Sequence, residues 1–91
     1  MGRFIHIYIK PNKDTTKDLL EQKLDLAVDW YRYETGLYVV YTTSTVEKWQ
    51  ERLLNLVKED GRLFICELHI NTKNGWMNKD FWEWINKSRD K

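Results

Sequence analysis

Cysteine and proline each occur once in this chain of 91 residues, and neither sign of charge dominates. A single cysteine excludes an internal disulfide and a zinc site built from several thiolates. The 15 Lys and Arg nearly balance the 14 Asp and Glu, so the chain lacks the overall positive field that drives non-specific binding to nucleic acid. No apolar run approaches the roughly 20 residues of a membrane span, and no signal-peptide pattern is present. We expect a cytoplasmic protein with no membrane anchor, in which any basic surface is local.

Aromatic residues, in contrast, are abundant. They make up 14% of the chain and include five Trp and five Tyr. A chain of this length forms one domain, residues 1–91, and buries only about 60–65% of the surface that its unfolded form exposes. Because so small a core cannot hide every ring, we expect some of the rings to contact a partner.

Alternation in residues 3–10 predicts a first strand, and helical spacing predicts a helix after it. In the strand, one face carries Ile5, Ile7 and Ile9, and the other carries Phe4, His6 and Tyr8. The helix is expected from about Thr16 to Ala27, with Thr15 as its N-terminal cap.

A hairpin and a second helix follow. Residues 30–34 and 37–43 are rich in β-branched and aromatic residues and are joined through Gly36, which can take the positive φ of a tight turn. The second helix is expected to be capped by Ser44 and to end at Gly61. Its apolar spacing predicts that Leu53 and Leu54 are both buried.

Residues 62–70 predict a fourth strand, and Asn78 is expected to cap a last helix. We expect the helix-covered face of this strand to carry Phe64, Cys66, Leu68 and Ile70, and its other face to carry Leu63, Ile65, Glu67 and His69. Cys66 is then a small buried hydrophobic residue. In the last helix Phe81, Trp84 and Ile85 form an apolar stripe, and Met77 and Trp82 have the spacing of a hydrophobic staple.

These elements predict an α+β protein with the ferredoxin-like order β-α-β-β-α-β, a four-stranded antiparallel sheet and an extra C-terminal helix. Two helices would cover one face and leave the other open. That open face is too apolar to be left to water, so we expect it to form a homodimer interface, or to bind another protein. The expected interface residues are Phe4, His6, Tyr8, Leu63, Ile65, Trp76 and Trp82.

Four stretches also carry a resemblance to a known family. They are the hairpin Trp30…Glu34-Thr-Gly-Leu-Tyr-Val-Val-Tyr-Thr-Thr-Ser44, the Glu47…Leu53 helix, the strand Gly61-Arg-Leu-Phe-Ile-Cys-Glu-Leu and the closing Trp76…Lys79-Asp-Phe-Trp-Glu-Trp-Ile pattern. Over residues 3–88 the chain resembles the small Cas2-like proteins of the SinR family, which are related by fold to CRISPR-associated Cas2 and to VapD-type toxins. The resemblance implies a ferredoxin-like homodimer of a prokaryotic defence or toxin–antitoxin system, whose relatives bind or cut nucleic acid.

One departure from the family bears on catalysis. The resemblance implies an Asp at the end of the first strand as a metal ligand for phosphodiester hydrolysis, but this chain reads Tyr8-Ile9-Lys10 there and has no acid before Asp14. We therefore expect a binding or regulatory protein without catalysis and without a cofactor. The alternative is a metal-dependent endoribonuclease whose site has been relocated, so that Asp14, or the pair His6 and Glu67, carries the activity.

Two weaker patterns leave alternatives open. If residue 6 lies opposite residue 67, then His6, Glu67 and His69 share one face and form a ligand set known from zinc sites, or simply a cross-strand hydrogen bond. The rings of Phe4, Tyr8 and Tyr38 are either a base-stacking platform for single-stranded RNA or structural aromatics.

Overall fold

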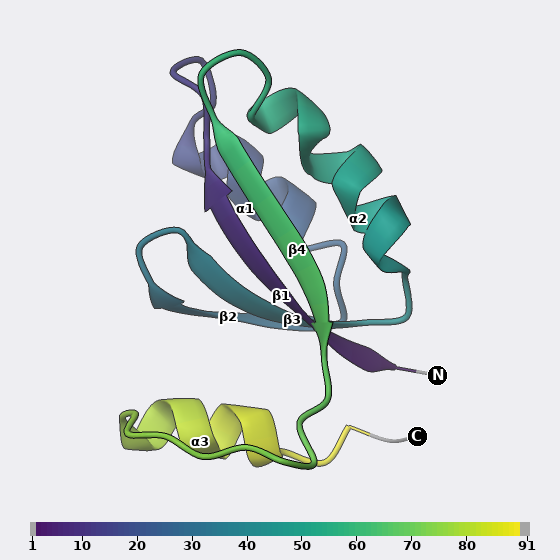
Figure 1. Cartoon of the computed structure of the whole chain (residues 1–91), viewed down its shortest axis with the longest axis vertical. Coiled ribbons are helices and arrows are strands. Elements are labelled where there is room, and N and C mark those ends of the chain that lie inside the picture. The colour runs from purple at the N-terminus through teal and green to yellow at the C-terminus, as the bar shows by residue number, and fades with distance from the viewer. Residues whose placement is uncertain (1, 90–91) are drawn as a thin grey trace.

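The computed structural model describes residues 2–89 and shows a small α+β protein. Its elements are β1 (Arg3–Lys10), α1 (Lys17–Leu24), β2 (Asp29–Glu34), β3 (Leu37–Thr42), α2 (Val46–Leu53), the 3-10 turn η1 (Leu54–Leu56), β4 (Arg62–Leu68) and α3 (Lys79–Asn86). All paired strands are antiparallel, in the order β2-β3-β1-β4 (Figure 1). The predicted α+β class and four-stranded antiparallel sheet are confirmed.

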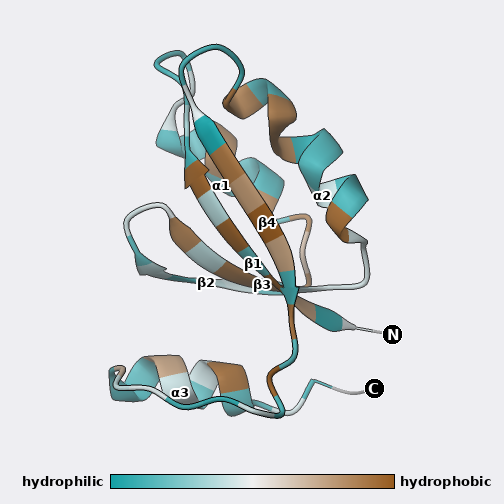
Figure 2. Ribbon diagram, in the orientation of Figure 1, coloured by the Kyte–Doolittle hydropathy of each residue, from teal (hydrophilic) through white to brown (hydrophobic). Residues whose placement is uncertain are grey.

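The main core lies between the sheet and the layer formed by α1 and α2. The row Ile5, Ile7 and Ile9 of β1 is fully buried there, and so is Trp49 of α2. The Trp49 indole nitrogen donates a hydrogen bond of 3.1 Å to the buried Thr42 hydroxyl, which satisfies both polar groups. Figure 2 shows hydrophobic residues in β1, β3 and β4, whereas α2 mixes hydrophobic and hydrophilic residues, as an amphipathic helix does.

Both helix caps lie one residue later than predicted. Thr16 caps α1 by accepting a hydrogen bond from the Leu19 amide, and Thr45 caps α2 by accepting one from the Lys48 amide. Thr15 instead ties the turn before α1 together, because its hydroxyl donates to the Asn12 side chain at 2.7 Å. Adjacent hydroxyl residues are chemically equivalent caps, so tertiary contacts decide between them.

The end of α2 also differs from the prediction. The α-helix stops at Leu53, and Glu59, not Gly61, takes the positive φ of 83°. Gly61 is needed for another reason, because a Cβ at this position would lie 2.5 Å from the Lys10 carbonyl oxygen. Leu53 is fully buried as predicted, but the prediction for Leu54 was wrong: it starts the 3-10 turn and is 39% exposed.

The register of β4 reverses the face predicted for each of its side chains. His6 lies opposite Cys66, and Ile5 lies opposite Glu67. Because a shift of one residue moves every side chain to the other face, Leu63 and Ile65 pack against the helix-covered core. Their partners on the opposite face are Phe64, Cys66 and Leu68, and β4 ends before His69 and Ile70.

The face opposite α1 and α2 is partly covered by α3. Asn78 caps this helix as predicted, accepting a hydrogen bond of 2.9 Å from the Phe81 amide. Phe81 packs edge-on against Tyr31, with ring centroids 5.7 Å apart, and Trp84 packs edge-on against Phe4 at 5.9 Å. The chain therefore covers by itself part of the face that the sequence left open. Within residues 2–89, no helix has the length and apolar character to cross a membrane.

Candidate functional site

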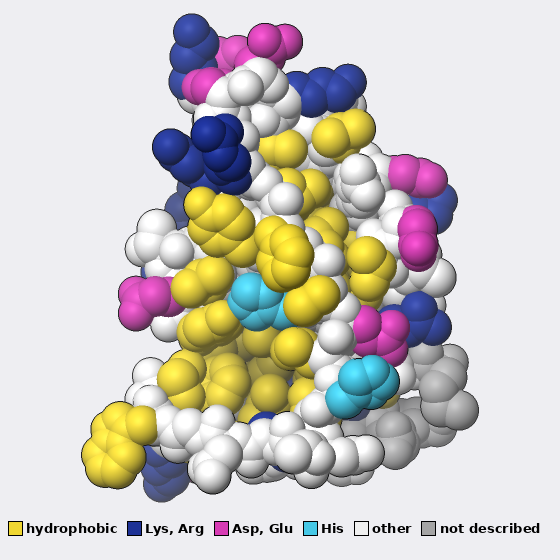
Figure 3. Space-filling view, viewed as in Figure 1, with side chains coloured by type: hydrophobic (Ala, Val, Ile, Leu, Met, Phe, Trp, Pro, Cys, Tyr) yellow, Lys and Arg dark blue, Asp and Glu magenta, His cyan; other side chains and the backbone are white. Residues whose placement is uncertain are grey.

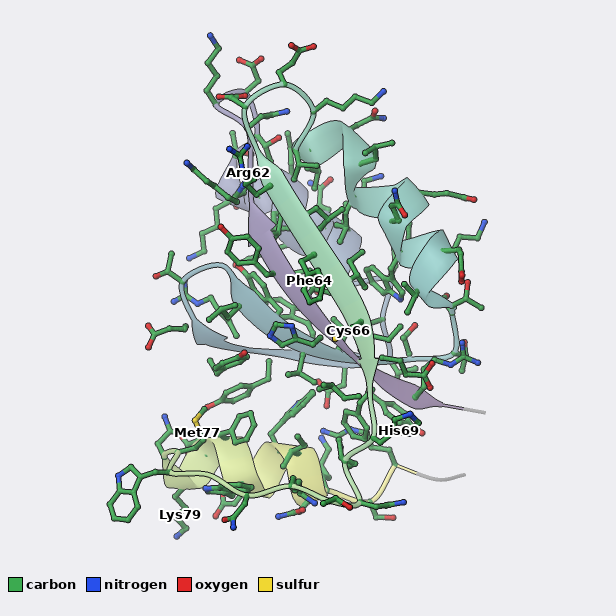
Figure 4. The ribbon with its side chains drawn as sticks, viewed as in Figure 1. Arg62, Phe64, Cys66, His69, Met77 and Lys79 are labelled. Atoms are coloured by element: carbon green, nitrogen blue, oxygen red, sulfur yellow. The ribbon has the colours of Figure 1, made fainter. Side chains whose placement is uncertain are left out.

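Two cross-strand pairs at one end of the sheet bring aromatic and basic side chains together on its α3 side. Tyr8 lies opposite Phe64, and Lys10 lies opposite Arg62, two residues further along each strand. Residues two apart on a strand share a face, so these four side chains form one surface, here called the basic-aromatic patch. Figure 4 shows Arg62 and Phe64 in succession along β4.

The patch is open to solvent. Phe64 is 61% exposed, an unusual state for a phenylalanine on a sheet, and both Lys10 and Arg62 are exposed. Figure 3 shows Lys and Arg side chains gathered beside the upper part of the hydrophobic surface of the sheet. Exposed rings next to cations can bind a ligand that is both flat and anionic.

A groove of about 480 Å³ continues the patch around the sheet edge. Lys17 of α1 and Arg32 of β2 line it together with Lys10 and Tyr8. Lys17 lies 4.0 Å from Glu21, an exposed ion pair that solvent screens and that leaves this lysine available for a phosphate. The groove extends the positive surface from the open face toward α1.

The β2–β3 turn lines this groove and lies close against β1. Gly36 has a φ of 78° and accepts a hydrogen bond of 2.9 Å from the Ile9 amide. A Cβ at Gly36 would lie 2.9 Å from the Ile9 carbonyl oxygen, so a larger residue would separate the turn from β1. Gly36 thus allows the β2–β3 turn, which lines the groove, to pack closely against β1, the strand that carries Tyr8 and Lys10.

Further along β1, His6 is bonded to a residue that the sequence did not pair with it. Its Nε2 lies 2.7 Å from the Tyr33 hydroxyl oxygen. Burial lowers the pKa of His6 below its ordinary value of 6.5 and raises the pKa of Tyr33 above its ordinary value of 10.0. Both groups are therefore neutral at pH 7.

At the other end of the sheet, the Asp29 carboxylate ties the C-terminal segment to β2. Its Oδ2 accepts a hydrogen bond of 2.9 Å from the Trp84 indole and lies 3.4 Å from both Lys87 Nζ and the Arg89 guanidinium. Burial alone would raise the pKa of Asp29, but the bond from Trp84 and the two cations outweigh it and lower the pKa. The Arg89 guanidinium also lies over the Trp84 ring, 4.4 Å from its centroid.

The proposed metal ligands do not come together. His6 and Glu67 are on opposite faces of the sheet, because His6 pairs with Cys66, and His69 lies beyond the end of β4. Asp14 lies in the exposed turn before α1. Residues 2–89 contain no group of three or more His, Cys, Asp or Glu placed to hold a metal ion.

The expected interface residues fall into three groups. Phe4, His6 and Tyr8 are on the α3 side, where Phe4 and His6 are near α3 and Tyr8 is in the patch. The prediction that Leu63 and Ile65 lie on the open face was wrong, because both pack against the core on the helix-covered face. Trp76 and Trp82 both line a cavity between α3 and the sheet, and Trp76 is 99% exposed. Tyr38, which the sequence suggested as a residue for stacking on RNA bases, is buried on the helix-covered face.

Sequence reasoning missed Phe64 and Arg62 because the predicted register put Phe64 in the core. Tyr31 and Tyr33 were also missed, although their alternation with Trp30 and Arg32 signals an aromatic face on β2.

Comparisons of the chain with protein families, with curated proteins and with solved structures found no match.

Proposed function

We propose that this protein is a small non-enzymatic binding protein that engages single-stranded nucleic acid through the basic-aromatic patch. The observation that supports this is the pairing of Tyr8 with Phe64 beside the pairing of Lys10 with Arg62. Proteins that bind single strands combine rings on which bases stack with cations that follow the phosphates. Both components are present here on one exposed surface.

The balanced net charge fits a local mode of binding. With a net charge of +1, the chain offers no general attraction for a polyanion, so affinity must come from Lys10, Arg62 and the groove residues Lys17 and Arg32. Few phosphate contacts also mean a shallow dependence on salt. The bases inside a duplex have both faces covered by stacking, whereas the splayed bases of a single strand can lie on Phe64.

The finer assignment of the fold and family is part of the proposal. The strand order β2-β3-β1-β4 and the succession of elements fit a ferredoxin-like domain, and the Cas2-like class rests on the sequence resemblance over residues 3–88. On that assignment the protein acts in the cytoplasm as a binding or regulatory component of a prokaryotic defence or toxin–antitoxin system. The alternative, a metal-dependent endoribonuclease, has less support because Tyr8-Ile9-Lys10 occupies the place of the acid that the resemblance implies.

A homodimer remains a second proposal, since Phe64 and the neighbouring apolar surface that α3 leaves uncovered can also be buried by another copy of the chain. A second copy and a nucleotide strand cannot occupy this surface together. If both form, nucleic acid will convert dimers into monomers, which sedimentation with and without oligonucleotide measures directly.

Fluorescence anisotropy with labelled oligouridylate and oligothymidylate tests the main proposal. Phe64→Ala should weaken binding by about 1–3 kcal/mol without changing the salt dependence, whereas Arg62→Ala should reduce the slope of log K against log salt by about 0.7. Trp76→Ala is the matched aromatic control, because Trp76 is 99% exposed but lines the cavity beside α3, which shares no residue with the patch. Absence of saturable binding at low salt, or equal losses in Phe64→Ala and Trp76→Ala, would refute the proposal.

A further inference from the structure

A cavity of about 290 Å³ lies between α3 and the sheet face that α1 and α2 leave uncovered. The sheet side of the cavity includes His6, Tyr33, Val39 and Leu68, and the α3 side includes Phe81 and Trp82. Figure 3 shows the molecule hollowed at this place, between the hydrophobic side chains of the sheet and α3. All four strands thus contribute one wall, and α3 contributes the other.

On the sheet side of the cavity, the polar side chains form one uncharged pair. His6 and Tyr33 are hydrogen-bonded at 2.7 Å, and burial keeps both neutral at pH 7 by shifting the pKa of each. The remaining lining is largely apolar. Among the lining residues within the described chain, only Lys73 carries a charge, and its Nζ donates to the Ile70 carbonyl at 3.0 Å. A cationic ligand would lose hydration here without gaining a counter-ion among the lining residues of the described chain.

The size and shape of the cavity restrict the ligand further. An apolar cavity of about 150 Å³ holds one benzene ring, so the volume here suits about two fused rings. The Phe81 and Trp82 rings stand nearly perpendicular, at 78° with centroids 5.4 Å apart. Such a corner favours a flat molecule that stacks on one ring and meets the edge of the other.

The helix that closes the cavity is fastened at its far end. Trp84, Lys87 and Arg89 all reach the Asp29 carboxylate, so α3 is held over the sheet by contacts outside the cavity. The space beneath it therefore persists without a side chain filling it.

We propose that this cavity is a binding site for a neutral, planar aromatic molecule of one or two rings that carries a hydrogen-bonding group facing His6 and Tyr33. The site is separate from the basic-aromatic patch and does not depend on the function proposed for it. Its ligand needs no phosphate and no charge.

Titration with indole, followed through the indole N–H signals of the protein, tests this proposal. Saturable binding should shift the Trp82 signal, identified with Trp82→Phe, and leave the signal of Trp49 in the main core unchanged. Tryptamine, which carries a positive charge, should bind much more weakly, because no acidic side chain lines the cavity within the described residues.

Two variants locate the site. Tyr33→Phe removes the hydroxyl and should weaken indole binding about fivefold. Tyr31→Phe is the matched control, because Tyr31 lies on the same face of β2 but its hydroxyl points to Asn78 at 3.4 Å. Leu68→Phe should abolish binding by filling the cavity, and Arg62→Ala should leave it unchanged. No saturable binding to the folded protein, or equal affinities for the Tyr33→Phe and Tyr31→Phe variants, would overturn the proposal.

Discussion

The Trp84 indole nitrogen donates a hydrogen bond of 2.9 Å to the carboxylate of Asp29, which joins α3 to the first residue of β2. The same carboxylate lies 3.4 Å from Lys87 and from Arg89, so three groups of the C-terminal segment converge on one acid. This acid determines how firmly α3 is held against the sheet.

Asp29→Asn should therefore loosen α3. The amide retains an acceptor for Trp84 but loses the charge that attracts Lys87 and Arg89, and we expect a loss of about 1 kcal/mol in unfolding free energy. Urea denaturation gives the value, and the Trp84 N–H signal should move. Asp60→Asn, in the exposed turn before β4, is the control and should change stability little.

The effect of Asp29 should also depend on pH in a defined direction. Its pKa in the folded protein is lowered from about 3.8, so the stabilisation by its charge is fully present above that value and is lost as the pH falls through the folded pKa. The stability difference between wild type and Asp29→Asn should stay constant near neutral pH and shrink in acid. A difference that grows below pH 4 would contradict the assignment.

Leu53 and Leu54 offer a neighbouring pair with opposite environments. Leu53 is fully buried, whereas Leu54 is 39% exposed. Leu53→Ala should cost about 2–5 kcal/mol through lost burial and a cavity, and Leu54→Ala should cost less than about 1 kcal/mol. Chemical denaturation of the two variants measures both; equal losses would show that Leu54 is buried in solution.

Substitution by Lys should likewise have different effects on stability at two adjacent residues of β4, Phe64 and Ile65. Ile65→Lys places a cation against the main core and should destabilise the protein by several kcal/mol, on the order of a buried unpaired charge. Phe64→Lys changes an exposed side chain and should leave the fold intact while converting any dimer to monomer. Sedimentation and denaturation distinguish these results, and a stable Ile65→Lys monomer would reverse the assigned faces.

Purified protein should not degrade RNA or DNA above background with Mg²⁺ or Mn²⁺. The argument is the absence of an acid in Tyr8-Ile9-Lys10, where the family resemblance implies a metal ligand. Incubation with labelled substrates measures the activity. Cleavage that disappears on Asp14→Asn, in protein free of contaminating nuclease, would support the endoribonuclease alternative.

His6 should titrate below 6.5, because burial lowers its pKa. In the pH range between its folded pKa and 6.5 the unfolded chain binds the extra proton, so stability should fall as the pH falls through that range. Histidine ring resonances followed against pH measure the pKa, with His69→Gln used to assign the signals. A pKa above 6.5 would mean that the ring is not buried as described.

Local periodicity was enough to predict the elements whose two faces differ in polarity. In β1 the buried row Ile5, Ile7 and Ile9 alternates with larger polar or aromatic residues, and the apolar spacing of α2 identified Leu53. The strand β4 has apolar residues on both faces, with Leu63 and Ile65 on one and Phe64 and Leu68 on the other. In such a strand, alternation does not show which face is buried, so the register with β1 could not be predicted. The prediction that His6 and Glu67 lie on one face was wrong for that reason.

The contacts of the C-terminal segment could not be predicted locally. Nothing near Asp29 in the sequence indicates that Trp84 and Arg89 will reach it, because the pairing depends on how α3 crosses the sheet. The Asn78 cap and the stripe containing Phe81 and Ile85 were predictable, since they depend only on spacing within the helix.

The position of β1 between β3 and β4 has a kinetic consequence. Its pairing with β3 already spans α1 and β2, and its pairing with β4 must in addition span β3 and α2. Such long closures cost more chain entropy and slow folding. Until β4 pairs with β1 during folding, one edge of this hydrophobic strand, which carries Ile5 and Ile7, has no hydrogen-bonding partner. Unpaired strand edges of this kind pair readily with other chains. Refolding yield should therefore fall as protein concentration rises, even where the native protein is stable.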